Sequence, residues 1–307
     1  AKAAGIKPII GCEVYMARRK MTDRIHGLDN DPYHLVLLCE NQKGYENLCY
    51  LVSEAFLHGF YGKPRVDLEL LEGHHEGLIA LSACLAGAIP QALMNENYDE
   101  AKRMALELSR IFGPEHFYLE MQDHGIDKQR PVNQGLQRLA RETGLPLVVT
   151  NDAHYLRRED ADMQDVLLCI QTGKTVDDLN RMRFETQEFY LKSEQELRQL
   201  FPGCDEAFDN TEKIAQMCNV DHTFHEYQLP AYPVPEGYTN EGYFRMLCEK
   251  GFQERNPDAP QEYRERMEYE INVISSMGYV NYYLIVWDFI HYAKSVGIPV
   301  GPGRGSG

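Results

Sequence analysis

The sequence predicts an α/β fold over residues 1–222 and a helical segment over 223–307. In the first part, short apolar runs of strand length alternate with longer amphipathic stretches of helix length. This repetition favours a parallel sheet, either doubly wound or closed into a barrel. A proline-rich segment at 227–237 ends the alternation, because proline neither continues a helix nor pairs inside a sheet. It therefore predicts a domain boundary.

The expected elements follow in chain order. The strands are continuous apolar runs, at 8–15, 33–38, 77–82, 116–121 and 145–150. The helices of the first part are amphipathic, at 44–58, 99–111, 128–143 and 158–170. The first of them spaces Leu48, Leu51 and Val52 along one face, as a half-buried helix requires. Beyond the boundary, helices are expected at 240–255, 261–277 and 282–295, before a glycine-rich end.

Composition narrows the class of protein. Of 307 residues, 43% are hydrophobic and 25% are charged, as in an ordinary globular protein. No apolar run approaches the roughly 20 residues that span a bilayer, so we expect a cytoplasmic location. The eight cysteines are scattered singly, which argues against a disulfide framework and against a zinc finger. A net charge of −16 argues against a broad electrostatic grip on nucleic acid by this segment alone.

Side chains that bind metals gather at the ends of predicted strands. Five such residues lie within or just after the C-terminal ends of strands: Glu13, His34, Cys84, Asp152 and His154. Ligands collect at this edge in α/β folds. Asp152 and His154 are two residues apart, so in an extended segment they point to the same side. Carboxylate, imidazole and thiolate together suit zinc, with manganese or iron as alternatives, and such ions activate water for attack on a phosphodiester.

Each candidate also has a structural interpretation. A single strand-end His or Asp more often caps a loop than binds a metal, and Cys84 alone would be a small buried hydrophobic residue. Only their convergence favours a metal site. His124, which follows the strand at 116–121, is either a substrate contact or a turn residue. Arg18 and Arg19, in a basic cluster, either contact an anionic strand or keep the surface soluble.

Five motifs carry a resemblance to a known family. They are GCEVY at 11–15, YHL at 33–35, LSACL at 81–85, TNDAHY at 150–155 and GPGRGS at 301–306. In this order they resemble the alpha subunits of bacterial DNA polymerase III, the C-family replicative polymerases. The resemblance covers the whole chain. It implies that residues 1–222 are a polymerase and histidinol phosphatase (PHP) domain, a distorted (β/α)7 barrel lacking its first strands, and that 223–307 are the mostly helical start of the palm.

The resemblance also implies site residues. It assigns the five candidate ligands to a cluster of up to three ions, zinc or manganese, whose four other ligands lie upstream of Ala1. A domain that keeps them resembles a 3′–5′ proofreading exonuclease. The residues implied to hold the incoming nucleotide are Gly303, Arg304, Gly305 and Ser306. The catalytic aspartates of the palm, which bind two magnesium ions, are expected beyond Gly307.

Together these inferences predict an internal fragment of a DNA-directed DNA polymerase that is inactive in synthesis by itself. The expected partners of the parent protein are primer–template DNA, deoxynucleoside triphosphates and replisome subunits such as the sliding clamp. Two alternatives stay open. One is a stand-alone PHP phosphoesterase such as a histidinol phosphatase, which predicts a chain that ends near residue 220. The other is a metal-free structural PHP domain, which has no need of Cys84, Asp152 and His154 together.

Overall fold

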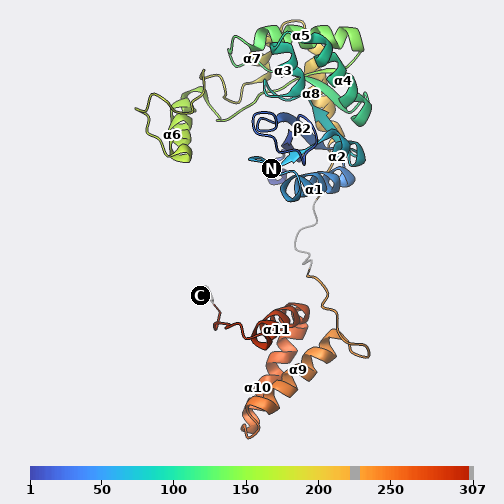
Figure 1. Cartoon of the computed structure of the whole chain (residues 1–307), viewed down its shortest axis with the longest axis vertical. Helices are drawn as coiled ribbons and strands as arrows, with labels where there is room; N and C mark the ends of the chain where they lie inside the picture. The colour runs from blue at the N-terminus through green and yellow to red at the C-terminus, as the bar shows by residue number, and fades with distance from the viewer. Residues whose placement is uncertain (222–228, 304–307) are drawn as a thin grey trace. The chain divides into compact units, whose positions relative to one another are not determined.

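The computed structural model describes residues 1–221 and 229–303, and the chain divides into two compact units, Ala1–His222 and Thr223–Gly307. Figure 1 colours the first unit from blue to gold and the second from orange to red. The first unit is mixed α/β and the second is helical, so the predicted fold classes are confirmed. In the described part of the chain, no helix has both the length and the apolar character needed to cross a membrane.

A six-stranded sheet forms the centre of the first unit. Its strands are β1 (Gly11–Met16), β2 (Tyr33–Cys39), β3 (Arg65–Val66), β4 (Leu78–Leu81), β5 (Phe117–Met121) and β6 (Leu147–Val149), in the spatial order β3-β1-β2-β4-β5-β6. The β1/β2 and β2/β4 pairs are antiparallel, and the other pairs are parallel. Among these six strands β2 alone is therefore reversed.

This reversal corrects the expectation of a wholly parallel sheet. A parallel connection needs a crossover of a dozen or more residues, usually a helix. The segment between β1 and β2, residues 17–32, forms turns and bends without a helix, and the chain returns beside β1 in the opposite direction. The crossover rule holds for β4, β5 and β6, which are separated by helices and run parallel.

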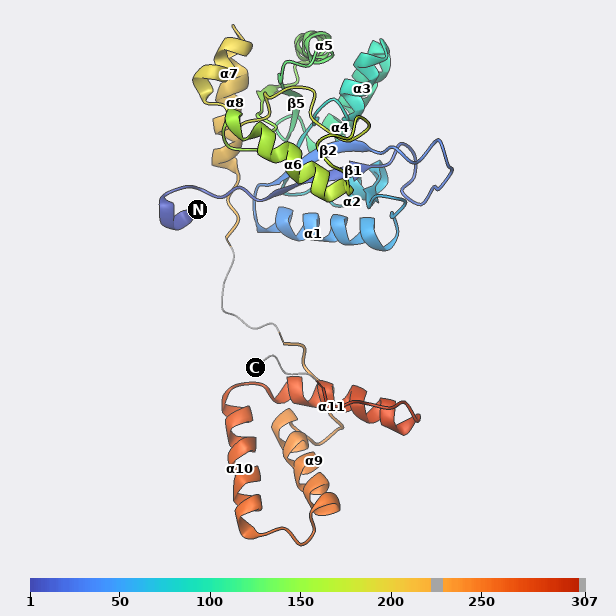
Figure 2. The ribbon, with the colours of Figure 1, turned by 90° about the vertical axis from the view of Figure 1, so that its left-hand side faces the viewer.

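Helices cover both faces of the sheet. The helices of the first unit are α1 (Gln42–Leu57), α2 (Leu68–Gly73), α3 (Ala88–Met94), α4 (Tyr98–Phe112), α5 (Gln129–Thr143), α6 (Ala161–Thr172), α7 (Glu194–Leu200) and α8 (Asp205–Met217). Figure 2 shows α1 lying along β1 and β2. The longer helices match the predicted ranges closely. The short helices α2, α3 and α7 were not predicted, and neither was α8.

Strand alternation divides the apolar side chains between two cores. In β4, Leu78 and Ala80 point into the main core against α1, α3, α4 and α5, whereas Ile79 and Leu81 point into a smaller core. Ile214 of α8 closes the smaller core. Because successive strand residues face opposite sides, a strand covered on both sides is apolar throughout. The metal-ligating candidates lie on the face of the smaller core, as described below.

Over its described residues, 229–303, the second unit has three helices, α9 (Asn240–Arg255), α10 (Gln261–Ser276) and α11 (Val280–Ser295). Their bounds agree with the ranges predicted from the sequence. Phe244, Ile271, Val280 and Leu284 form the buried centre of this unit. Thr239 begins α9 as its N-cap, because its side chain accepts a hydrogen bond from the Gly242 amide.

Candidate metal centre

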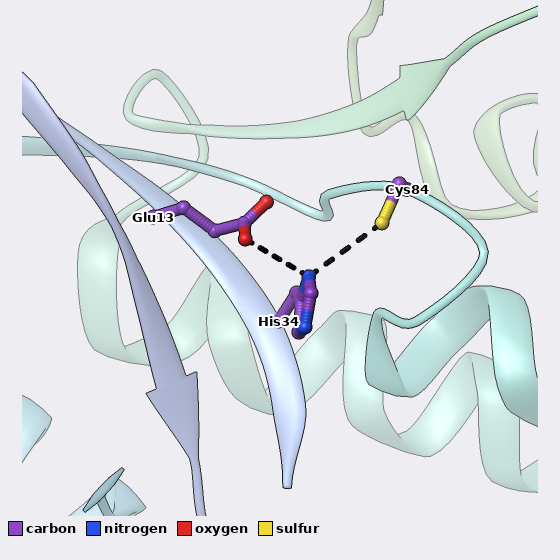
Figure 3. A group of neighbouring side chains, drawn as sticks. All are labelled: Glu13, His34 and Cys84. Carbon is purple, nitrogen blue, oxygen red and sulfur yellow. Dashed lines mark hydrogen bonds and ion pairs between the residues drawn. The ribbon is translucent and has the colours of Figure 1, made fainter. Parts of the chain in front are cut away.

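Three of the predicted ligands meet at one point. Glu13, His34 and Cys84 each offer a ligand atom, and these atoms all lie within 4.8 Å of one another. The Nδ1 atom of His34 lies 3.0 Å from Oε1 of Glu13 and 3.7 Å from Sγ of Cys84. Figure 3 shows the carboxylate and the thiol approaching the same imidazole nitrogen from two sides.

The register of β1 and β2 brings Glu13 and His34 together. His34 pairs with Tyr15, two residues after Glu13, so the two side chains share one face of the sheet. The alternate residues, such as Val14 and Leu35, point into the main core. His34 stands at the start of β2, which corrects the expectation that it ends a strand. Because β2 is reversed, its start lies at the edge where the parallel strands end.

A tight loop after β4 carries Cys84 to this point. The Cys84 carbonyl accepts a hydrogen bond from the Gly87 amide (2.9 Å), and the His34 amide donates to the carbonyl of Ala86 (3.0 Å). Ala83 has a φ of 63°, in the left-handed region that a residue with a Cβ seldom adopts. A Cβ at Gly87 would lie only 2.1 Å from the carbonyl oxygen of Ser82. The loop therefore requires glycine at 87 to close onto β2.

Glu13 and His34 perturb each other's protonation, and Cys84 adds to the effect on His34. The hydrogen bonds of His34 with Cys84 and with Glu13 raise the pKa of His34 to about 10, and partial burial opposes them only in part. The hydrogen bond from His34 lowers the pKa of Glu13. In the metal-free chain at neutral pH, His34 is thus a cation between a carboxylate and a sulfur. A divalent cation in the same position would make the same attractive interactions after displacing the proton.

Asp152 and His154 form a neighbouring pair after β6. Nε2 of His154 lies 3.3 Å from Oδ1 of Asp152, and both side chains are more than a third exposed. The charge of His154 contributes to the lowered pKa of Glu13, so the pair lies near the first three residues. In the described part of the chain, the group within 4.8 Å contains Glu13, His34 and Cys84 and not this pair.

Two aromatic rings contact His154. Its imidazole lies 4.7 Å from the ring of Phe184 and 5.7 Å from that of Phe189. His124 stacks on Phe189, with ring centroids 4.4 Å apart and the planes parallel. His124 is only 2% exposed, its Nδ1 bonds with Nε2 of Gln129 at 2.9 Å, and burial lowers its pKa to about 4. The His124 ring is thus neutral and covered, and a substrate contact, one of the two roles that the sequence left open for His124, stays a prediction.

Arg18 and Arg19 are exposed, but their donors are engaged within the chain. Arg18 donates to the hydroxyl of Tyr33, to Oε1 of Gln91 and to a backbone carbonyl. Arg19 pairs with the buried carboxylate of Asp29 at 2.7 Å. Both therefore hold the segment between β1 and β2, and Arg18 does so beside the residue that precedes His34. A contact with substrate stays a prediction for both.

The nucleotide-binding candidates fall largely outside the described residues. Gly303 is exposed, with a φ of 80° that suits glycine. Arg304, Gly305 and Ser306 lie outside the part of the chain that the structure describes.

Comparisons with known proteins agree on one family. The model of the PHP domain matches residues 1–124, and that of the bacterial DNA polymerase III alpha NTPase domain matches residues 242–307. DNA polymerase III subunit alpha of Treponema pallidum is 48% identical over 307 residues, which are 99% of this chain and 26% of the relative. The same subunit of Borreliella burgdorferi is 45% identical, over 100% of this chain and 27% of the relative. The same subunit of Thermus aquaticus is 40% identical, over 100% of this chain and 30% of the relative.

The chain belongs to the DNA polymerase III alpha-subunit family. The resemblance inferred from the five motifs is thereby confirmed. This alpha-subunit chain spans between a quarter and a third of the length of these curated relatives. The two family models match separate parts of it, one in each compact unit.

The donor set of Glu13, His34 and Cys84 fits a metal ion. Atoms bound to one tetrahedral zinc lie roughly 3.2–3.8 Å apart, given Zn–N and Zn–S bonds of about 2.0 and 2.3 Å. The two separations around His34, 3.0 and 3.7 Å, are close to this range. Two buried side-chain oxygens, Oε1 of Gln122 and Oδ1 of Asn151, the latter in the residue before Asp152, have no hydrogen-bond partner among the described residues. Unpartnered buried oxygens suit a bound cation or an ordered water.

Two buried charged residues, Arg65 and Glu120, were not identified from the sequence. Arg65, with 0% exposure, donates to the carbonyls of Gly59, Asp29, Met21 and Asp23, and burial lowers its pKa. Nothing local in the sequence marks it. Glu120 lies inside the apolar run of β5 and is 4% exposed. An acidic residue inside an apolar strand could have indicated a buried, hydrogen-bonded carboxylate, since burying a carboxylate is costly unless partners compensate.

Proposed function

We propose that the chain is a part of a DNA-directed DNA polymerase in which residues 1–222 are the PHP domain and 223–307 begin the palm. We further propose that the PHP domain is a metal-dependent 3′–5′ proofreading exonuclease. The observation that carries the second proposal is the meeting of Glu13, His34 and Cys84 within 4.8 Å, with the Asp152–His154 pair close by. Membership in the alpha-subunit family supports the first.

Each residue of the centre has a separate task in this proposal. Glu13 and Cys84 supply negative charge, and His34 supplies a ring nitrogen once it has lost its proton. Asp152 and His154 add two further ligands, and Oδ1 of Asp152, 3.3 Å from Nε2 of His154, also orients that imidazole. The bound metal, zinc or manganese, would polarise the phosphodiester and lower the pKa of an attacking water. Phe184, half-buried beside His154, offers a ring face near the terminal base.

The polymerase role assigns the remaining partners. Primer–template DNA, deoxynucleoside triphosphates with magnesium, and replisome subunits such as the sliding clamp are partners of the whole protein, and a cytoplasmic location follows from this role. The incoming nucleotide would contact the loop at 303–306. The net charge of −16 requires that most phosphate contacts come from other parts of that protein.

Neither alternative accounts for both units. A stand-alone phosphoesterase leaves the match of residues 242–307 to a polymerase family without a role. A metal-free scaffold leaves the three clustered ligand side chains without a role. A polymerase with an active metal centre accounts for both observations.

The substitution Asp152→Asn in the full-length polymerase tests the exonuclease. It removes a charged ligand without changing the shape of the side chain, so exonuclease activity should fall at least about 100-fold while synthesis is retained. Asp209→Asn, at an exposed position of α8, is the matched control and should leave both activities intact. Equal loss of both activities would show that Asp152 is structural. Unchanged exonuclease activity would rule out the proposed centre.

A further inference from the structure

Glu120 is a buried carboxylate with three hydrogen-bond donors around it. Its Oε1 accepts from the Thr150 hydroxyl and from Nε2 of Gln122 (3.1 Å), and its Oε2 accepts from the amide of Ala83 (2.9 Å). Burial raises its pKa, and these donors favour the ionised form. Alternation along β5 places Glu120 on the same face as Tyr118, in the smaller core, and this is also the face of His34.

The donors belong to the two segments that carry the proposed ligands. Ala83 precedes Cys84, and the amide of Glu120 also bonds with Oγ of Ser82 at 2.8 Å. Thr150 precedes Asp152 by two residues, and its amide donates to the carbonyl of Met121 at 3.1 Å. One carboxylate thus joins the loop after β4 to the segment after β6 across β5.

We propose that Glu120 is a positioning residue that fixes the Cys84 loop relative to the Asp152–His154 segment. This inference rests on the proposed metal centre for its functional meaning, while the connection itself exists without metal. It also gives a reason for the positive φ of Ala83, since that conformation aims the Ala83 amide at the carboxylate. The two oxygens of a carboxylate accept bonds from both segments at once, which an apolar side chain does not.

Two variants distinguish the hydrogen bonds of Glu120 from the size and the charge of its side chain. Glu120→Ala leaves the Ala83 amide and the Thr150 hydroxyl without their partner. Glu120→Gln keeps the shape, and its amide group can donate to Oε1 of Gln122 once the Gln122 amide turns over, because Nε2 of Gln122 faces position 120 in the unsubstituted chain. We expect Glu120→Ala to weaken metal binding about 10–100-fold and Glu120→Gln to restore it to within about threefold. If Glu120→Ala does not fold, Glu120→Asp, one methylene shorter, replaces it.

Asn210→Ala is the matched control. Asn210 is also buried, and its Nδ2 donates to the carbonyl of Leu147 (2.8 Å), at the end of β6 away from Thr150. Its loss should lower the unfolding temperature without affecting the ligand segments. An effect on metal binding that Glu120→Ala shows and Asn210→Ala does not is therefore due to the position of the ligand segments and not to a general loss of stability.

Two readouts on the intact chain test the proposal. Hydrogen exchange of the metal-free protein should become faster at both 82–87 and 150–154 in Glu120→Ala, and at neither in Asn210→Ala. Titration with cobalt(II), followed by the thiolate-to-cobalt absorption of Cys84, should show the loss of affinity without any assay of activity.

The outcomes distinguish this inference from the proposed function. Faster exchange in one segment only, or equal cobalt affinity in Glu120→Ala and the unsubstituted chain, would overturn the positioning role. Faster exchange in both segments of a chain that binds no cobalt would support the connection and overturn the metal centre. Faster exchange in both segments together with weaker cobalt binding supports both.

Discussion

Metal binding at the Glu13–His34–Cys84 group should strengthen as the pH rises, because His34 holds a proton that a metal ion has to displace. Hydrogen bonds with Cys84 and Glu13 raise the pKa of His34 to about 10, and a metal ligand requires the neutral imidazole. Below that pKa, each pH unit should therefore raise the apparent affinity about tenfold through His34.

The size of the effect follows from the same geometry. A pKa of about 10 leaves about one His34 in a thousand neutral at pH 7, which corresponds to about 4 kcal/mol of competition. The side chains of His34 and Glu13 are 26% and 45% exposed, so solvent screens the pair. We therefore expect proton competition of about 10–100-fold at pH 7.

Cobalt(II) or zinc titrations across neutral and alkaline pH measure this competition. The slope of log affinity against pH should be smaller by about one in His34→Gln than in the unsubstituted chain. His116→Gln is the control, because His116 pairs with Glu40 elsewhere in the unit (3.3 Å) and should leave the slope unchanged. Equal slopes in the unsubstituted chain and in His34→Gln would refute the reasoning. So would a His34 pKa near 6.5, measured by NMR of the metal-free chain.

The same ion pair makes the stability of the metal-free chain depend on pH. The folded chain raises the pKa of His34 above its ordinary value of 6.5. The stabilisation is therefore complete below pH 6.5 and is lost as the pH rises through about 10. After the same allowance for exposure, it should amount to about 2–3 kcal/mol. The unfolding temperature should fall with rising pH over this range, and it should fall less in His34→Gln.

Two further substitutions test how the site is held. Gly87→Ala brings a methyl group against the Ser82 carbonyl and should displace the loop that carries Cys84. Metal affinity, measured by a cobalt titration, should therefore fall at least about tenfold. Gly73→Ala is the control and should leave this affinity unchanged, because the added methyl group lies in open space. Arg65→Lys keeps the charge but loses the guanidinium fork, so it should lower the free energy of unfolding by about 2–4 kcal/mol in urea melts and speed proteolysis within 17–32. Arg157→Lys, in the exposed pair with Glu159, is the control and should change neither the free energy of unfolding nor the proteolysis. An equal loss of stability in Arg157→Lys and Arg65→Lys would contradict the proposed role of the Arg65 guanidinium.

Local patterns in the sequence determined most of the long helices of this chain, although not α8. The apolar spacing of α1, α4 and α5 predicts their bounds to within a few residues, because each helix buries one stripe and the period of that stripe is visible in the sequence. The α/β class follows from the same periodicity. Short elements such as β3 and α2 gave too few residues for a period to show.

The sequence also determined which side chains could bind a metal, because residue type and position at strand ends are local facts. Only the tertiary structure decided that Glu13, His34 and Cys84 meet. The direction of β2 and its register with β1 depend on pairing between segments far apart in the chain, and a reversed strand places its first residue where a parallel strand would place its last. The buried partner Glu120 was decided in the same way, because its three donors are separated from one another along the chain and come together only when β4, β5 and β6 pair.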